Sequence, residues 1–143
     1  MQGWLLDTNV IASLIQPNGA PSVKAWAAEQ DEERLWLSIL TLAEYDKGIA
    51  NLPDDDANRA RYMAARDALE QRFEGRVLSL SNAVVRRWGV ISGHVRRNSR
   101  KALPVIDALF AATAIEHDLC FVTRNLKDVA DTGATLFSPW DGV

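Results

Sequence analysis

The sequence predicts an α/β protein whose central sheet is mostly parallel and holds four to five short strands. Short apolar runs alternate along the chain with segments of helical periodicity, which is the pattern of an α/β protein. The runs are apolar at successive positions, as expected for strands that helices cover on both faces. With 143 residues, 48% of them hydrophobic, the chain suits one domain, and we expect a single domain over residues 1–143.

The first half of the chain predicts two strands, each followed by a helix. "GWLLD" is apolar up to Asp7, and "TNVIASLI" then pairs Val10 with Leu14 and Ile11 with Ile15 at helical spacing. "QPNGAPS" is typical of a loop, a helix follows it, and "RLWLS" is strand-like. "ILTLAEYDKGIANL" is again helical. We therefore expect strands at 3–7 and 34–38 and helices at 8–15, 20–30 and 39–52.

The second half repeats this alternation. Residues 53–75 predict a long polar helix, because Pro53 and three aspartates favour its start and a glycine follows its end. "RVLSLS" predicts a third strand, Ser81 is a candidate cap of the next helix, and an alanine-rich helix precedes "LCFVTRN". The expected elements are strands at 76–81, 119–125 and within 134–140, and helices at 53–75, 81–98 and 105–118.

Composition narrows the class of protein. The net charge is -3, so a nucleic acid would have to meet a local basic patch. Cys120 is the only cysteine, which excludes an intrachain disulfide, and His94 and His117 have no metal-ligand spacing. The sequence has neither a signal peptide nor an apolar run near the ~18 residues that a membrane helix needs. We therefore expect a cytoplasmic protein.

Four acidic residues follow the expected strands. Asp7 lies at the end of the first strand, Glu44 is in the helix after the second, Asp107 opens the helix before the fourth, and Asp128 lies just beyond the fourth with Asn125 between. Ligands of parallel α/β sheets bind at the carboxyl ends of the strands, where these residues would meet. Individually, Asp7 and Asp107 also suit a helix cap or a helix dipole.

Together, the acids favour a metal site. Two carboxylates ~5 Å apart repel by roughly 3 kcal/mol at an effective dielectric constant of ~20. A divalent cation removes this repulsion, and a set of oxygen ligands suits Mg²⁺ or Mn²⁺.

The chain resembles the PIN-domain ribonucleases, and among them the VapC/FitB-type toxins of type II toxin–antitoxin systems. The resemblance covers nearly the whole chain and rests on "LLDTNVIASL", "LAEYDKGIANLP", "VIDALFAATAIEHDLCFVTRNLKDV" and "SPW". It implies a PIN-like three-layer α/β/α fold and an endoribonuclease that needs Mg²⁺ or Mn²⁺ and cuts single-stranded or loop RNA. It also implies a homodimer that an antitoxin encoded beside it holds inactive.

The resemblance assigns roles to individual residues. Asp7 and Asp107 would hold the metal most directly and Glu44 would complete the site, so these acids and Asp128 are the expected catalytic and metal-binding residues. Many relatives carry an acid where this chain has Asn125. The fourth acidic role would then pass to Asp128, with Asn125 as a neutral ligand or an orienting group.

Two threonines adjoin the expected site. A hydroxyl of Thr8 or Thr123 would hold the attacking water, although a capping or turn role explains either residue equally well. "SPW" and Val129 also depart from the commoner family pattern, but the three central acids are present.

RNA binding needs cations around an acidic pocket. The candidates are Arg96, Arg97, Arg100 and Lys101 in "RRNSRK", and Arg124 beside the fourth strand. The alternative is that Arg96 and Arg97 complement a helix C-terminus and that the others are only solvated.

Three other classes of protein share some of these sequence features. A catalytically silent PIN-like adaptor, acting by protein or nucleic-acid binding alone, is the main alternative, although such a protein would be expected to have lost acids. A haloacid dehalogenase-type phosphatase needs an acid where this chain has Asn9, and a receiver domain needs an acidic pair at the first strand. Neither requirement is met.

Overall fold

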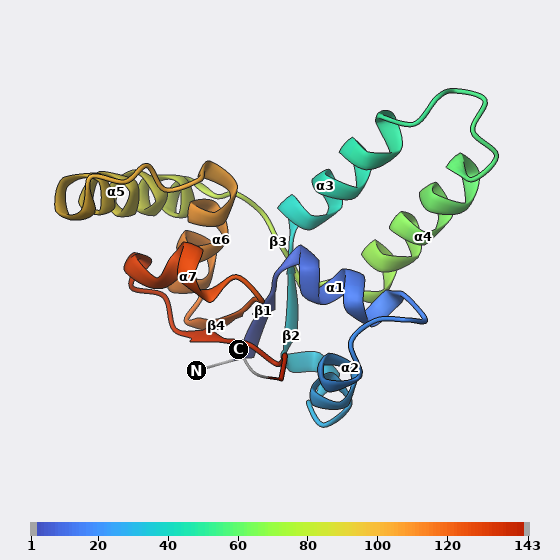
Figure 1. Cartoon of the computed structure of the whole chain (residues 1–143), viewed down its shortest axis with the longest axis horizontal. Helices are drawn as coiled ribbons and strands as arrows, with labels where there is room; N and C mark the ends of the chain where they lie inside the picture. The colour runs from blue at the N-terminus through green and yellow to red at the C-terminus, as the bar shows by residue number, and fades with distance from the viewer. Residues whose placement is uncertain (1–2, 142–143) are drawn as a thin grey trace.

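A computed structural model describes residues 3–141 and contains a five-stranded parallel sheet (Figure 1). The strand order is β3-β2-β1-β4-β5, and every pairing is parallel. The strands are β1 (Gly3–Leu6), β2 (Leu35–Ser38), β3 (Val77–Leu78), β4 (Leu119–Val122) and β5 (Leu136–Phe137). The helices are α1 (Thr8–Ile15), α2 (Pro21–Ala28), α3 (Ile39–Ala50), α4 (Arg59–Arg72), α5 (Asn82–Ser99), α6 (Val105–Glu116) and α7 (Leu126–Val129), with short 3₁₀ helices at Glu32–Arg34 and Ala130–Thr132.

Successive residues of the strands pack into two different hydrophobic cores. Leu6 and Val122 point to the face covered by α1, α2, α3 and α4. Leu5 and Phe121 point to the opposite face, where Phe110 of α6 stacks on Phe121 with ring centroids 5.5 Å apart. A third cluster joins α5 to α6. Helices on both faces explain why the strand sequences do not alternate, and they confirm the predicted three-layer α/β/α class.

The register of the central strands brings their carboxyl ends to one edge. Leu6 of β1 pairs with Val122 of β4, and Leu5 pairs with Trp36 of β2. The pairing continues past the strand ends, because the Asp7 N–H donates to the Val122 carbonyl over 2.9 Å. The segments that follow β1, β2 and β4 therefore begin side by side.

One predicted helix was wrong at its start. The helix expected over 53–75 begins only at Arg59, and residues 53–58 form turns. The Asp56 carboxylate accepts the Asn58 N–H at 2.8 Å, and the Pro53 carbonyl accepts the Asp56 N–H at 3.0 Å. Short polar side chains that bond to nearby backbone compete with helix formation.

Several smaller differences concern length. The third and fifth strands shrink to two residues each, and α7 is an additional helix inside the segment after β4. Ser81 does cap α5, since its hydroxyl accepts the Val84 N–H at 3.2 Å. Cys120 is buried, and His94 and His117 are exposed.

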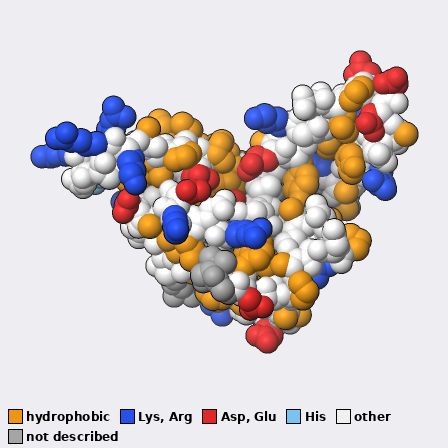
Figure 2. Space-filling view, viewed as in Figure 1, with side chains coloured by type: hydrophobic (Ala, Val, Ile, Leu, Met, Phe, Trp, Pro, Cys, Tyr) orange, Lys and Arg blue, Asp and Glu red, His pale blue; other side chains and the backbone are white. Residues whose placement is uncertain are grey.

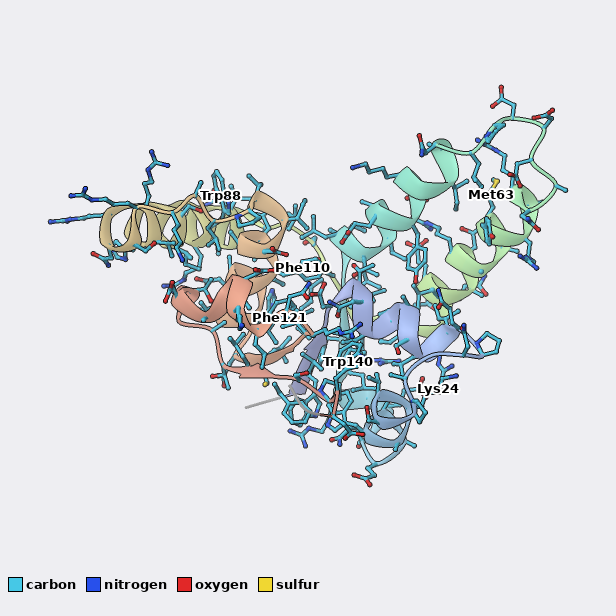
Figure 3. All side chains as sticks on the ribbon, in the orientation of Figure 1. Lys24, Met63, Trp88, Phe110, Phe121 and Trp140 are labelled. Atoms are coloured by element: carbon cyan, nitrogen blue, oxygen red, sulfur yellow. The ribbon has the colours of Figure 1, made fainter. Side chains whose placement is uncertain are left out.

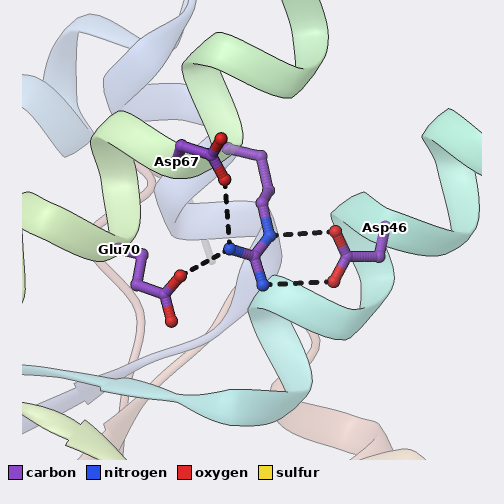
Figure 4. Close-up of polar contacts among 4 residues, drawn as sticks. Asp46, Asp67 and Glu70 are labelled. Atoms are coloured by element: carbon purple, nitrogen blue, oxygen red, sulfur yellow. Dashed lines mark hydrogen bonds and ion pairs between the residues drawn. The ribbon is translucent and has the colours of Figure 1, made fainter.

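Helices α3 and α4 form an arm that projects from the sheet (Figure 1). The Arg66 guanidinium of α4 bonds to both carboxylate oxygens of Asp46 on α3, over 2.9 and 3.2 Å (Figure 4). It also contacts Asp67 and Glu70 on its own helix. Hydrogen bonds with Asp46 and Glu70 raise the pKa of Arg66. This bidentate pair fixes the angle between the two helices with a geometry that a lysine cannot reproduce.

No helix within residues 3–141 is long and apolar enough to cross a membrane.

Replacing Gly19 by alanine is expected to destabilise the protein by about 1–3 kcal/mol, the usual cost of overpacking. A Cβ at Gly19 would lie 1.7 Å from the Ser13 carbonyl oxygen, so the loop between α1 and α2 must shift. Gly89→Ala is the matched control, because nothing lies within 4 Å of its Cβ position and alanine favours helix. Urea denaturation measures both variants, and equal stability of the two would contradict the packing described here.

Candidate active site

A cleft of about 340 Å³ opens at the carboxyl edge of the sheet. Its walls come from α1, α3, α6 and the segment after β4. One lining residue, Phe110, lies near the centre of the molecule (Figure 3). The lining residues are Asp7, Thr8, Asn9, Ala12, Glu44, Ile106, Asp107, Phe110 and Asn125. Acidic side chains gather on both sides of this hollow (Figure 2). Three of the four predicted acids therefore border one cavity.

Asp7 is the most firmly held of these acids. It ends β1 and serves as the N-cap of α1, and only 8% of it is exposed. One carboxylate oxygen accepts the Thr8 N–H at 2.7 Å, and the other accepts the Thr123 hydroxyl at 2.7 Å. Thr123 in turn accepts the Asn125 N–H at 3.1 Å. Asp7 is thus both the N-cap of α1 and a lining residue of the cleft, and the hydrogen bond from Thr123 connects it to the end of β4.

Glu44 reaches the cleft from α3. Its carboxylate accepts the Thr8 hydroxyl at 2.8 Å, and the same hydroxyl lies 2.9 Å from that of Thr41. Glu44 is exposed, whereas Thr41 is fully buried. Thr8 therefore connects the second predicted acid to the helix that carries the first.

Asp107 and Asp128 lie on the α6 and α7 side. Asp107 is half-buried in the first turn of α6. Asp128 is exposed on α7 and does not line the cleft, but its charge acts on Asp107. Asn125 does line the cleft, so the two candidates for the fourth position occupy different places.

The pKa values reflect this crowding. Burial raises the pKa of Asp7, and the charges of Asp107 and Glu44 raise it further, against hydrogen bonds from Thr123 and Thr8. Burial likewise raises the pKa of Asp107, to which the charges of Asp128 and Glu44 add. Folding thus brings together carboxylates that would be more stable apart.

The donor set suits a hard divalent cation. Across residues 3–141, no three His, Cys, Asp or Glu side chains are arranged to hold a metal ion together. The cleft nevertheless presents several oxygen donors, and the buried Asn9 Oδ1 meets no hydrogen-bond donor among these residues. A water molecule bound to a cation at Asp7 and Asp107 would supply that donor. The residues that line the cleft therefore fit Mg²⁺ or Mn²⁺ in kind.

The predicted cations lie away from the cleft. Arg96 and Arg97 are in the last turn of α5, and Arg100 ends that helix in a left-handed conformation with φ 58°. The far end of α5 is the outer tip of the left lobe, where basic side chains gather (Figures 1 and 2). Arg124 lies closer, next to Thr123, with its guanidinium 5.5 Å from the Trp140 ring centre.

The sequence pattern did not identify Asn9 or Thr41 as candidate site residues. Asn9 served only to exclude a phosphatase, and Thr41 carried no signal of its own. Thr41 precedes Glu44 by three residues, which places both on one side of a helix. That spacing was visible in the sequence, but nothing in it indicates that α1 packs against this side.

Comparison with known proteins agrees with this geometry. The PIN domain family matches residues 4–132. Toxin FitB of Neisseria gonorrhoeae is 29% identical over 136 residues, covering 95% of this chain and 97% of FitB. Plasmid stability protein StbB of Pseudomonas syringae pv. tomato is 30% identical over 141 residues, covering 96% of this chain and 98% of StbB.

Among solved structures, FitAcB from Neisseria gonorrhoeae superposes with a TM-score of 0.83 at 28% identity, covering 96% of this chain and 99% of that one. VapC ribonuclease Y4jK of Sinorhizobium fredii is 28% identical over 137 residues, or 96% of this chain and 97% of Y4jK. The chain therefore belongs to the PIN-domain family, in its VapC/FitB-type branch.

Proposed function

We propose that this single-domain protein is a cytoplasmic endoribonuclease that depends on Mg²⁺ or Mn²⁺ and is the toxin of a toxin–antitoxin pair. The observation that carries the proposal is the cleft at the strand ends, which Asp7, Glu44 and Asp107 enter from three separate segments. Relatives named VapC ribonuclease Y4jK, Ribonuclease VapC14 and Toxin FitB support the reaction class. A silent adaptor would not need three mutually repelling acids in one cavity.

Asp7 and Asp107 would hold the metal, with Glu44 contacting it directly or through water. Asp128 and Asn125 would orient a water or a second ion. The ion, when bound, lowers the pKa of a bound water and neutralises charge on the scissile phosphate. Thr123 and the Thr8 N–H keep the Asp7 carboxylate in one orientation. Burial of Asp7 lowers the local dielectric constant and strengthens its attraction for a cation.

The RNA would reach the cleft across cationic surface. Arg124, beside Thr123, would contact a phosphate near the cleft, since its guanidinium is exposed and stacked on Trp140. Arg96, Arg97, Arg100 and Lys101 would contact phosphates farther along the strand, from the tip of α5. Non-specific contacts of this kind position the RNA without selecting a sequence.

The inhibitor would be an antitoxin that occupies the cleft and an adjoining groove. One solved structure with this fold is a toxin–antitoxin complex from Klebsiella pneumoniae. In this chain, an apolar groove of about 360 Å³ lies between α1 and the α3–α4 arm. Its lining includes the exposed side chains of Ile15 and Tyr62, and also Glu44, which the groove shares with the cleft. An amphipathic segment of the antitoxin would fill this groove. We also propose a homodimer, as the family resemblance implies.

Asp7→Asn and Asp107→Asn are each expected to reduce RNA cleavage by orders of magnitude, because the cation loses a charge that holds it. With millimolar Mg²⁺ or Mn²⁺, the melting temperature of the parent should rise by mass action and that of the variants should rise less. Asp31→Asn is the control, since Asp31 only caps a 3₁₀ helix, through the Glu33 N–H. Variants that cut RNA normally would show that Asp7 and Asp107 are structural caps.

The same variants should change the pH dependence of stability in EDTA. A carboxyl whose pKa is raised by folding keeps its proton in the folded state while the unfolded chain loses it. The contribution of Asp7 to stability should therefore decline as the pH rises above the ordinary aspartate value of 3.8, until the raised pKa of Asp7 is passed. Asp7→Asn should flatten this decline. Urea denaturation between pH 3.5 and about 8 measures the difference, and parallel curves would refute it.

Replacing Arg96, Arg97, Arg100 and Lys101 together by alanine should weaken RNA binding and reduce its salt dependence. Each lost phosphate contact lowers the slope of log affinity against log salt by about 0.7 for a single strand. Metal-dependent thermal stabilisation should not change. The control keeps the charge, with lysine at the three arginines and arginine at Lys101. An unchanged slope in the alanine variant would remove the α5 tip from the RNA path.

The antitoxin is expected to insert a basic side chain, most simply an arginine, into the acidic cleft, in place of the cation. Mg²⁺ or Mn²⁺ should then compete with the antitoxin, so that its affinity for the parent falls as the metal concentration rises. Isothermal titration at several metal concentrations measures this. A cocrystal in which Asp7 and Asp107 remain open to solvent would contradict the expectation.

A further inference from the structure

Thr41 and Thr123 differ from two other buried threonines, Thr113 and Thr132, in where their hydroxyls are bonded. The hydroxyls of Thr113 and Thr132 donate to carbonyls of their own segments, those of Leu109 and Val129, each over 2.7 Å. Thr41 is equally inaccessible, with 0% exposed, yet its hydroxyl meets the Thr8 hydroxyl of another helix at 2.9 Å. A buried side chain bonded across two elements constrains both of them.

Counting protons fixes the direction of this contact. The Glu44 carboxylate has only acceptor oxygens, so the Thr8 hydroxyl must donate its single proton to Glu44 over the 2.8 Å between them. The Thr8 oxygen can then only accept from Thr41. The chain of donors therefore runs from Thr41 to Thr8 to Glu44, from the buried end to the exposed end.

We propose that Thr41 is a positioning residue for Glu44, acting through Thr8. By occupying one lone pair of the Thr8 oxygen, the Thr41 hydroxyl holds the Thr8 proton toward Glu44. The Glu44 side chain is long and exposed, and this donor holds it beside the cleft. Thr41 also sits three residues before Glu44 on α3, so the helix that carries the acid carries the group that orients it.

The consequence for metal binding and cleavage rests on the proposed function. Groups that orient metal ligands typically contribute 10- to 100-fold in metal affinity or activity. Asp7 has its own support in Thr123, which donates from the end of β4. Loss of Thr41 should therefore leave Asp7 in place and affect the Glu44 side of the site alone.

The test is Thr41→Val, which replaces the hydroxyl by a methyl group of similar size. Mn²⁺ affinity, measured by titration calorimetry without RNA, should fall about tenfold, and kcat should fall in the same proportion with KM for RNA unchanged. Thr113→Val is the matched control and should leave both at the parent values. Thr41→Ser should restore them, because serine keeps the donor. If Thr41→Val and Thr113→Val behave alike, the proposal is overturned.

A second measurement keeps the proposal testable if the protein proves to bind no metal. In a metal-free crystal structure of Thr41→Val, the Thr8 side chain should rotate and Glu44 should lose its single position, while Asp7 and Thr123 stay as in the parent. In parent protein studied by NMR, the Thr41 hydroxyl proton should exchange slowly and lie close to Thr8. If Glu44 keeps its position in the variant, or if the Thr41 proton is directed elsewhere, Thr41 does not position Glu44 through Thr8. A parent protein that neither binds Mn²⁺ nor cuts RNA would refute only the proposed function.

Discussion

The pairing of β1 with β2 on one side and β4 on the other is the constraint on which the rest of the structure depends. Parallel strands end at the same edge, so the residues that follow them are brought together whatever their distance in sequence. Asp7 continues the β1–β4 ladder by donating to Val122, and its carboxylate meets Thr123 within one residue of the end of β4. Shifting the register by one residue would turn the strand side chains to the other core and separate this pair.

This arrangement carries an electrostatic cost that the rest of the fold offsets. Asp7 is nearly inaccessible and close to other negative charges, and its pKa is accordingly raised. Two hydrogen bonds to its carboxylate replace part of the water that burial removed. The two apolar cores on either side of the sheet pack the helices against the strands and so hold together the segments that carry the acids. Strain of this kind is typical of sites that await a ligand of opposite charge.

The two candidates for a fourth position in the site, Asn125 and Asp128, lie in different places. Asn125 contributes to the wall of the cleft but carries no charge. Asp128, three residues on, is exposed on α7 and reaches the cleft only through its charge, which raises the pKa of Asp107. Asn125 lies at the start of the short helix α7, and Asp128 lies within it.

The sequence alone determined the class of fold and the identities of the central acids. Continuous apolar runs predicted strands β1, β2 and β4, because such runs require helices on both faces of the sheet. Helical spacing predicted most of the helices near their observed bounds. The start of α4 was harder to predict from the sequence. The Asp56 carboxylate accepts a hydrogen bond from the Asn58 N–H, and the helix begins only at Arg59. Asp7 was identified as an acid at the end of an apolar strand, Asp107 as an acid that opens a helix, and Glu44 as an acid inside the helix after the second strand.

Only the tertiary structure decided which groups touch these acids. Thr8 is 33 residues from Thr41 and 36 residues from Glu44 in the sequence. Thr123 is 116 residues from Asp7. No periodicity or spacing connects such residues, because hydrogen bonds between hydroxyls and carboxylates act over about 3 Å and so depend on how whole helices pack. The acids belong to local sequence patterns, whereas their partners are chosen by the strand order β2-β1-β4 and by the placement of α3 against α1.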